Sequence, residues 1–226
     1  MFHVLDSLRL SQPVLAGHGF GGQDLITIGA QRSDRVAGLV FLNSAEDPTL
    51  PFSAYDVEQL DPKKLPAALR EPPPPDTASF EAYRQWQMRV HGIMFPESEL
   101  RQQFEGNPDG TVGKLLFSEF ARDAIFKGRQ KPAYPRIRVH VLAFFSLPQP
   151  LEDQIRKYKP HNDEERAALA QQYSIDQAIV KKHMHDLQSG VPTAHIVTLE
   201  GANYYIFVSN EADILREMRV FIHVPK

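Results

Sequence analysis

The chain has 226 residues, of which 42% are hydrophobic and 23% charged, a composition typical of a soluble globular protein with one domain. The formal net charge of -3, with basic and acidic residues interspersed, argues against nucleic-acid binding. The absence of cysteine excludes disulfides, a thiol nucleophile and a cysteine-ligated metal. The first residues lack the pattern of a signal peptide and no apolar run is long enough to cross a bilayer, so we expect a cytoplasmic protein without membrane contacts.

Residues 2–43 are predicted to form a helix followed by one βαβ unit. Apolar residues at helical spacing favour helices over residues 2–10 and 20–32. Short apolar runs at residues 13–16 and 36–42 favour buried strands. Because a helix connects these two strands, we expect them to be parallel.

Residues 44–135 have a different character and are interpreted as a helical insertion. Apolar residues at helical spacing occur in two sets, Phe80/Tyr83/Trp86/Val90 and Leu115/Leu116/Phe120/Ile125. Four consecutive prolines at positions 72–75 are interpreted as a stiff linker inside this insertion rather than as a partner-binding ligand.

The α/β pattern returns after residue 135. We predict strands over residues 139–145 and 194–199, a long helix from about residue 162 to Gly190, and a closing helix over residues 209–222. The chain is therefore predicted to be a single α/β domain over residues 1–226, with a parallel sheet of about four strands flanked by helices. Residues 1–43 and 136–226 form its core, and residues 44–135 are the helical insertion.

Two segments carry a family resemblance. Gly17-His18-Gly19-Phe20-Gly21 lies between a strand and a helix, and Gly201-Ala202-Asn203-Tyr204 follows the last predicted strand. In this order and setting they resemble the nucleophile elbow and the histidine loop of the α/β-hydrolase fold superfamily, serine hydrolases of esterase type with a lid. The resemblance covers nearly the whole chain and implies that residues 44–135 form the lid.

The resemblance also implies that the fold begins with strands that this chain lacks, so that Met1 is a start inside the fold. The strand from Pro13 to Ala16 would then have an uncovered edge. We expect the chain to self-associate through that edge.

The resemblance places uncharged residues at the nucleophile and base positions of the catalytic triad. The nucleophile position is Gly19, which has no side chain, and the base position is Tyr204, whose phenol of pKa near 10 is a poor base at pH 7. Asn43 is the candidate acid position, and Phe20 would supply one oxyanion N–H. The other candidate acids are Glu46, Asp47, Glu152 and Asp153. We therefore expect a catalytically inactive protein that binds a small molecule or a protein through His18, Phe20 and Tyr204, without a metal or cofactor.

One alternative is an active hydrolase of esterase type that acts on a small molecule. It would use displaced residues such as His183, His185 or Asp153, with water as the direct nucleophile. A metal site at His183-Met184-His185-Asp186 is disfavoured, because residues two apart on a helix point to different sides.

The other alternative is a Rossmann-type dinucleotide-binding protein. Gly17, Gly19 and Gly22 satisfy its G-x-G-x-x-G fingerprint between a strand and a helix. However, Asn43 occupies the place where the ribose-binding acid is expected.

Overall fold

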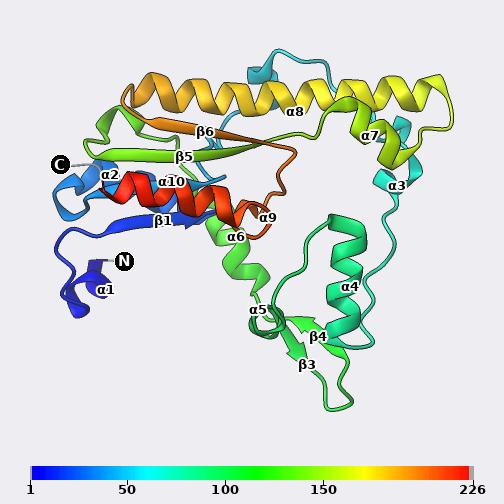
Figure 1. Cartoon of the computed structure of the whole chain (residues 1–226), viewed down its shortest axis with the longest axis horizontal. Coiled ribbons are helices and arrows are strands. Elements are labelled where there is room, and N and C mark those ends of the chain that lie inside the picture. The colour runs from blue at the N-terminus through cyan, green and yellow to red at the C-terminus, as the bar shows by residue number, and fades with distance from the viewer. Residues whose placement is uncertain (1, 224–226) are drawn as a thin grey trace. The chain divides into compact units, whose positions relative to one another are not determined.

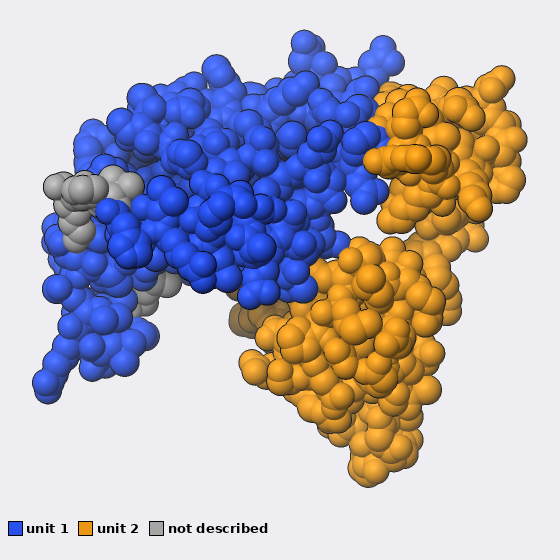
Figure 2. Space-filling model, in the orientation of Figure 1, with its two compact units in different colours: residues 1–59, 130–150, 172–226 blue, residues 60–129, 151–171 orange. Residues whose placement is uncertain are grey.

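A computed structural model describes residues 2–223, so the predicted start at Met1 lies outside the described residues. The chain divides into two compact units (Figure 2). The first consists of residues 1–59, 130–150 and 172–226, and the second of residues 60–129 and 151–171. The second unit thus begins later than the predicted insertion and also takes residues that follow the third core strand. The assignment of residues 44–135 as a lid stays a prediction.

The first unit is built on a parallel sheet of four strands (Figure 1). In spatial order the strands are β1 (Val14–His18), β2 (Gly38–Leu42), β5 (His140–Leu147) and β6 (His195–Glu200). The order follows the sequence, so every crossover joins neighbours. The predicted parallel sheet of about four strands is confirmed.

Helices cover both faces of this sheet because its strands carry apolar side chains in both directions. Helices α2 (Gly21–Gln31) and α8 (Asp163–Gly190) pack on the face that includes Phe41. Helices α9 (Ile206–Ser209) and α10 (Glu211–His223) pack on the opposite face, which includes Phe144. Both phenylalanines are fully buried, as expected for parallel strands covered on two sides. Among residues 2–223, no helix is long and apolar enough to cross a membrane.

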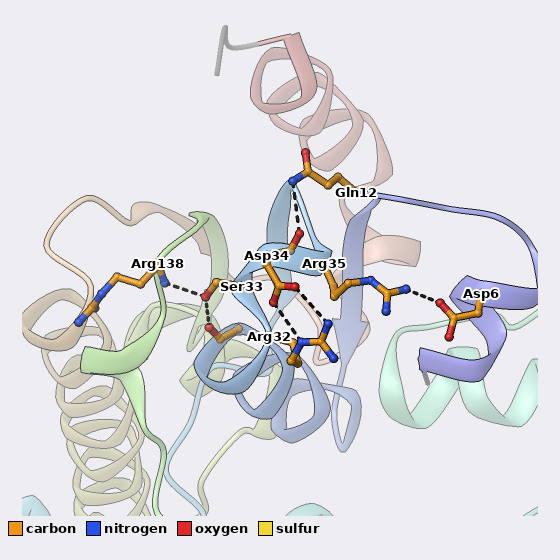
Figure 3. Close-up of polar contacts among 8 residues, drawn as sticks. Asp6, Gln12, Arg32, Ser33, Asp34, Arg35 and Arg138 are labelled. Carbon is orange, nitrogen blue, oxygen red and sulfur yellow. Dashed lines mark hydrogen bonds and ion pairs between the residues drawn. The ribbon is translucent and has the colours of Figure 1, made fainter.

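Ion pairs hold the amino-terminal end of the first unit together (Figure 3). The short helix η1 (Ser33–Arg35) follows α2, and Arg32 donates two hydrogen bonds to the carboxylate of Asp34, at 3.0 and 3.1 Å. Arg35 reaches back to Asp6 on α1 (Phe2–Ser7). The Arg35–Asp6 pair joins the first helix to the segment that leads into β2.

The first unit has two further short helical turns, η2 (Phe52–Tyr55) after β2 and η4 (Tyr134–Arg136) before β5.

The second unit contains most of the short elements. Its helices are η3 (Pro62–Lys64), α3 (Ala67–Arg70), α4 (Phe80–His91), α5 (Glu97–Gln103), α6 (Glu119–Lys127) and α7 (Leu151–Tyr158), and residues 163–171 add the first turns of α8. The predicted helix at Phe80 is confirmed, and Trp86 Nε1–H donates to the carbonyl of Pro73 at 3.0 Å. The proline run is thereby tied to α4.

The helical pattern predicted around Leu115 is wrong in its first half. Strands β3 (Phe104–Gly106) and β4 (Val112–Leu115) form an antiparallel hairpin, and α6 begins only at Glu119. The turn between the strands is Asn-Pro-Asp-Gly, in which Gly110 has φ +87°. This turn chemistry favours a hairpin over a continuous helix, and the apolar spacing alone did not reveal it.

A close approach of backbone fixes the start of α2 against the end of β2. A Cβ atom on Gly22 would lie 2.0 Å from the carbonyl oxygen of Ser44. The Ser44 hydroxyl in turn donates to the carbonyl of Gly17 at 2.8 Å, and Ser44 is buried. The first turn of α2 therefore packs directly on the backbone that follows β2.

We predict that Gly22→Ala lowers the free energy of unfolding by about 1–3 kcal/mol or more, because the added methyl group forces backbone apart. Gly21→Ala is the matched control, since nothing lies within 4 Å of its Cβ position and alanine is favoured in helices. Urea unfolding of both variants measures the difference. Equal stability of the two variants would contradict this packing.

Candidate functional site

The turn that follows β1 has the geometry of a sharp strand-to-helix turn. Gly19 has φ +54°, a left-handed conformation that residues with a side chain seldom adopt. A Cβ on Gly17 would lie 3.0 Å from backbone atoms of Gly21 and from the Leu25 side chain. Local geometry therefore favours glycine at both positions, at Gly19 for its torsion angle and at Gly17 for space.

The two segments that carry the family resemblance meet at Gly19. A Cβ on Gly19 would lie 3.0 Å from the phenolic oxygen of Tyr204, which belongs to the loop between β6 and α9. Burial raises the pKa of Tyr204, and the nearby Glu46 and Tyr205 raise it further. The hydroxyl beside Gly19 therefore belongs to a phenol that stays neutral at pH 7.

The side chain of His18 contacts the backbone of Tyr204. The Nε2 atom of His18 lies 3.2 Å from the carbonyl oxygen of Tyr204. A carbonyl can only accept, so Nε2 carries the proton and donates it. Partial burial lowers the pKa of His18, and the bond to the Tyr204 carbonyl opposes this only in part. His18 is thus a neutral ring that holds the Tyr204 backbone in place.

Aromatic side chains surround this contact. The His18 ring lies 4.5 Å from the Tyr204 ring, 5.2 Å from Tyr205 and 5.1 Å from Phe207, measured between centroids. Phe20, Tyr204 and Phe207 remain 41%, 49% and 38% exposed. The surface beside Gly19 is therefore apolar and aromatic.

Asn43 lies at the carboxyl end of β2, but its side chain is used to join strands. Its backbone N–H donates to the carbonyl of Phe144, and its Oδ1 accepts from the backbone N–H of Ser146, each at 3.0 Å. Its φ of +51° is tolerated because asparagine adopts this region more readily than most residues. Its assignment as the acid position stays a prediction.

Gln149 lies beside the loop that carries Tyr204, a position that the sequence reasoning did not predict. It follows β5 by two residues, and its Cγ atom lies 3.3 Å from the place of a Cβ on Gly201, in the loop that carries Tyr204. Glu152 and Asp153, which the sequence suggested after this strand, lie instead on α7 in the second unit. The signal that could have found Gln149 is its place immediately after the strand end.

The active-hydrolase alternative relied on His183, His185 or Asp153. The structure does not bring these three side chains together. The Nδ1 atom of buried His183 accepts the backbone N–H of Asp47 at 3.2 Å, and its Nε2 atom lies 3.3 Å from the Tyr55 hydroxyl. His185 is exposed on another side of α8, and Asp153 pairs with Arg156 on α7. Among residues 2–223, no group of three or more His, Cys, Asp or Glu residues could hold a metal ion.

No family model matches the sequence, and no curated protein matches it. Among solved structures, the chain is similar to E-2-(acetamidomethylene)succinate hydrolase, with 19% identity, 98% of this chain and 70% of that chain covered, and a TM-score of 0.59. It is also similar to an esterase from a marine microorganism (17% identity, 97% and 74% covered, TM-score 0.54). A third is the thioesterase domain from the curacin biosynthetic pathway (12%, 96% and 68%, TM-score 0.53). The fold is thus that of the α/β-hydrolases, as the resemblance implied.

We predict that stability falls on acidification because of His183. Burial lowers the pKa of His183 below its ordinary value of 6.5. The unfolded chain therefore binds the proton more readily, and the free energy of unfolding decreases as the pH falls below about 6.5.

His183→Gln keeps one acceptor and one donor but does not titrate, so we expect a smaller loss of stability between about pH 8 and about pH 5. Urea unfolding of the wild type and the variant over this range measures it. An unchanged pH dependence in the variant would rule out His183 as the source.

Proposed function

We propose that this chain, which has the α/β-hydrolase fold, binds a ligand at the surface around Gly19 and Tyr204 and does not hydrolyse it. The observation that carries this proposal is the contact between these two residues, in which the Tyr204 hydroxyl lies 3.0 Å from where a side chain on Gly19 would begin. A neutral phenol stands beside the nucleophile position, and no side chain stands in it. The machinery for acyl transfer is therefore lacking at this point.

Magnitudes support the loss of activity. Removing the serine or the histidine of a catalytic triad lowers turnover by roughly a millionfold. Here both positions hold other residues, and the amides Asn43 and Gln149 at the strand ends cannot stabilise a protonated base as a carboxylate does. Hydrolysis by the usual serine mechanism should be undetectable.

The ligand-binding part of the proposal rests on the aromatic surface. Phe20, Tyr204 and Phe207 are each more than a third exposed and carry no charge. Exposed aromatic side chains gathered at the carboxyl ends of parallel strands are typical of recognition surfaces. We expect the ligand to be a small molecule with an apolar or aromatic group, and a protein segment with such side chains is the alternative.

We predict that the purified chain neither hydrolyses a panel of p-nitrophenyl and naphthyl esters above background nor reacts with a fluorophosphonate probe. Gly19→Ser alone should not restore activity, because Tyr204 crowds the new side chain and cannot act as its base. Gly19→Ser combined with Tyr204→His should still label poorly, since β1 is an edge strand among residues 2–223 and no earlier strand there supplies a second oxyanion donor.

The same esters test binding without turnover by saturation-transfer NMR. Phe20→Ser should weaken the signal, while Leu8→Ser, which removes an apolar side chain of 63% exposure elsewhere, should not. Ester turnover by the wild type that Tyr204→Phe abolishes would refute the loss of activity. Binding that is unaffected by Phe20→Ser would refute the assigned surface.

We also propose that the chain self-associates through β1. Within residues 2–223, β1 pairs with β2 on one side and with no strand on the other. The carbonyl of Pro13 accepts from Ala37 on the β2 side, so by alternation the backbone groups of Ala16 face the free edge. An unprotected edge of this kind is a template for pairing with a second copy.

Size-exclusion chromatography with light scattering should accordingly detect a dimer or larger species whose fraction grows with concentration. Ala16→Lys should shift the chain toward monomer, because lysine on an edge strand opposes pairing. Leu8→Lys adds the same charge outside any strand and should leave the distribution unchanged. A stable monomer at high concentration would refute self-association.

A further inference from the structure

A pocket lies in the first unit, and Gly19 is not among its lining residues. Its volume is about 260 Å³, and it is bounded by the last residues of β5, the loop after β6 and one side of α8. The lining residues are Ser146, Leu147, Pro148, Asp176, Ile179, Val180 and Ala202. None of them belongs to the aromatic surface, although Ala202 is in the same loop as Tyr204.

Asp176 is the single acidic side chain in this lining. Its Oδ1 atom accepts a hydrogen bond from Gln172 Nε2 at 2.7 Å. The neighbouring positions on its helix face are Gln172, Tyr173, Ile179 and Val180, none of which is basic. Among residues 2–223, no Lys, Arg or His forms an ion pair with Asp176.

Asp186, farther along α8, has the basic partner that Asp176 lacks among the described residues. Asp186 lies four residues after Lys182, and both of its carboxylate oxygens are 2.5 Å from the Lys182 ammonium. Asp176 is partly buried without such a partner, and this burial raises its pKa, opposed only by the bond from Gln172. A partly buried carboxylate without a counter-charge is unfavourable, and a cation placed beside it would relieve that cost.

The apolar walls of the pocket indicate what kind of group could accompany a cation bound at Asp176. Leu147, Pro148, Ile179 and Val180 are apolar, so they suit a hydrocarbon chain and not a hydrated inorganic ion. The pocket is open to solvent, so an ammonium group with about four to six carbon atoms can lie along its apolar wall.

We propose that this cavity binds a small primary alkylammonium ion, with the ammonium group on Asp176 and the alkyl chain against Leu147, Ile179 and Val180. The site has its own residues and does not depend on the ligand proposed for the aromatic surface. It therefore adds a cation site to the aromatic surface proposed above.

The test uses n-pentylammonium chloride and its neutral counterpart 1-pentanol with the full chain at about pH 7.5, a pH at which the amine is charged. Isothermal titration or NMR titration should give saturable binding of pentylammonium and at least about tenfold weaker binding of pentanol, a difference of about 1.4 kcal/mol. Asp176→Asn should weaken pentylammonium binding by a similar factor. Asp24→Asn, which removes an exposed carboxylate on α2, should leave it unchanged.

Ile179→Phe, which fills the cavity while keeping Asp176, gives a second route to the same result and should also abolish binding. Circular dichroism and urea unfolding establish that each variant is folded before it is titrated. Pentanol binding as tightly as pentylammonium, or full binding by folded Asp176→Asn, would overturn the proposal. Absence of saturable pentylammonium binding to the wild type would overturn it as well.

Discussion

The parallel register of four strands is the constraint on which the other features depend. Because β1, β2, β5 and β6 run in the same direction, the residues that follow them all emerge at one edge of the sheet. Gly19, Asn43, Gln149 and Tyr204 come from four distant parts of the sequence and reach this edge for that reason. Backbone contacts then hold them there: Asn43 bonds to Ser146, and Gly22 packs on Ser44.

This edge is closely packed, and most of the side chains around it are uncharged. The glycines at positions 17, 19 and 22 meet demands of torsion angle or space. Apart from Glu46, whose carboxylate raises the pKa of Tyr204, the side chains around it are aromatic rings, amides and a neutral imidazole. Such a surface favours packing against an apolar ligand over proton transfer, which is the physical basis for proposing binding in place of hydrolysis.

A charged side chain, that of Asp176, lines the pocket beside α8. Within the part of the chain that the structure describes, Asp176 has no counter-ion there, whereas Asp186 on the same helix has one. His183, between them in sequence, is buried and bonded to the loop after β2. Helix α8 thus has two roles in the first unit: it fixes the loop that follows β2, and it lines a cavity with an uncompensated carboxylate.

Much of the fold could be predicted from the sequence, because apolar periodicity is a local property. The strand before Gly17, the helix from Gly21, the long helix ending at Gly190 and the closing helix all appear within a few residues of their predicted bounds. The β3–β4 hairpin was missed because the helical prediction rested on the apolar residues from Leu115 onward, whereas the signal for the hairpin is the Asn-Pro-Asp-Gly turn that precedes them. In the site, Gly19 and Tyr204 could be paired from the resemblance alone.

Only the tertiary structure decided which polar side chains form hydrogen bonds or ion pairs with distant segments. No local pattern indicates that Asn43 is bonded to Ser146, that Gln149 and not Glu152 lies beside the Tyr204 loop, or that His183 is bonded at Nδ1 by a loop more than a hundred residues earlier. Nor does the sequence distinguish Asp176 from Asp186 until their surroundings are known. Periodicity specifies which face of an element is buried, whereas hydrogen bonds and ion pairs between distant segments depend on how those elements pack.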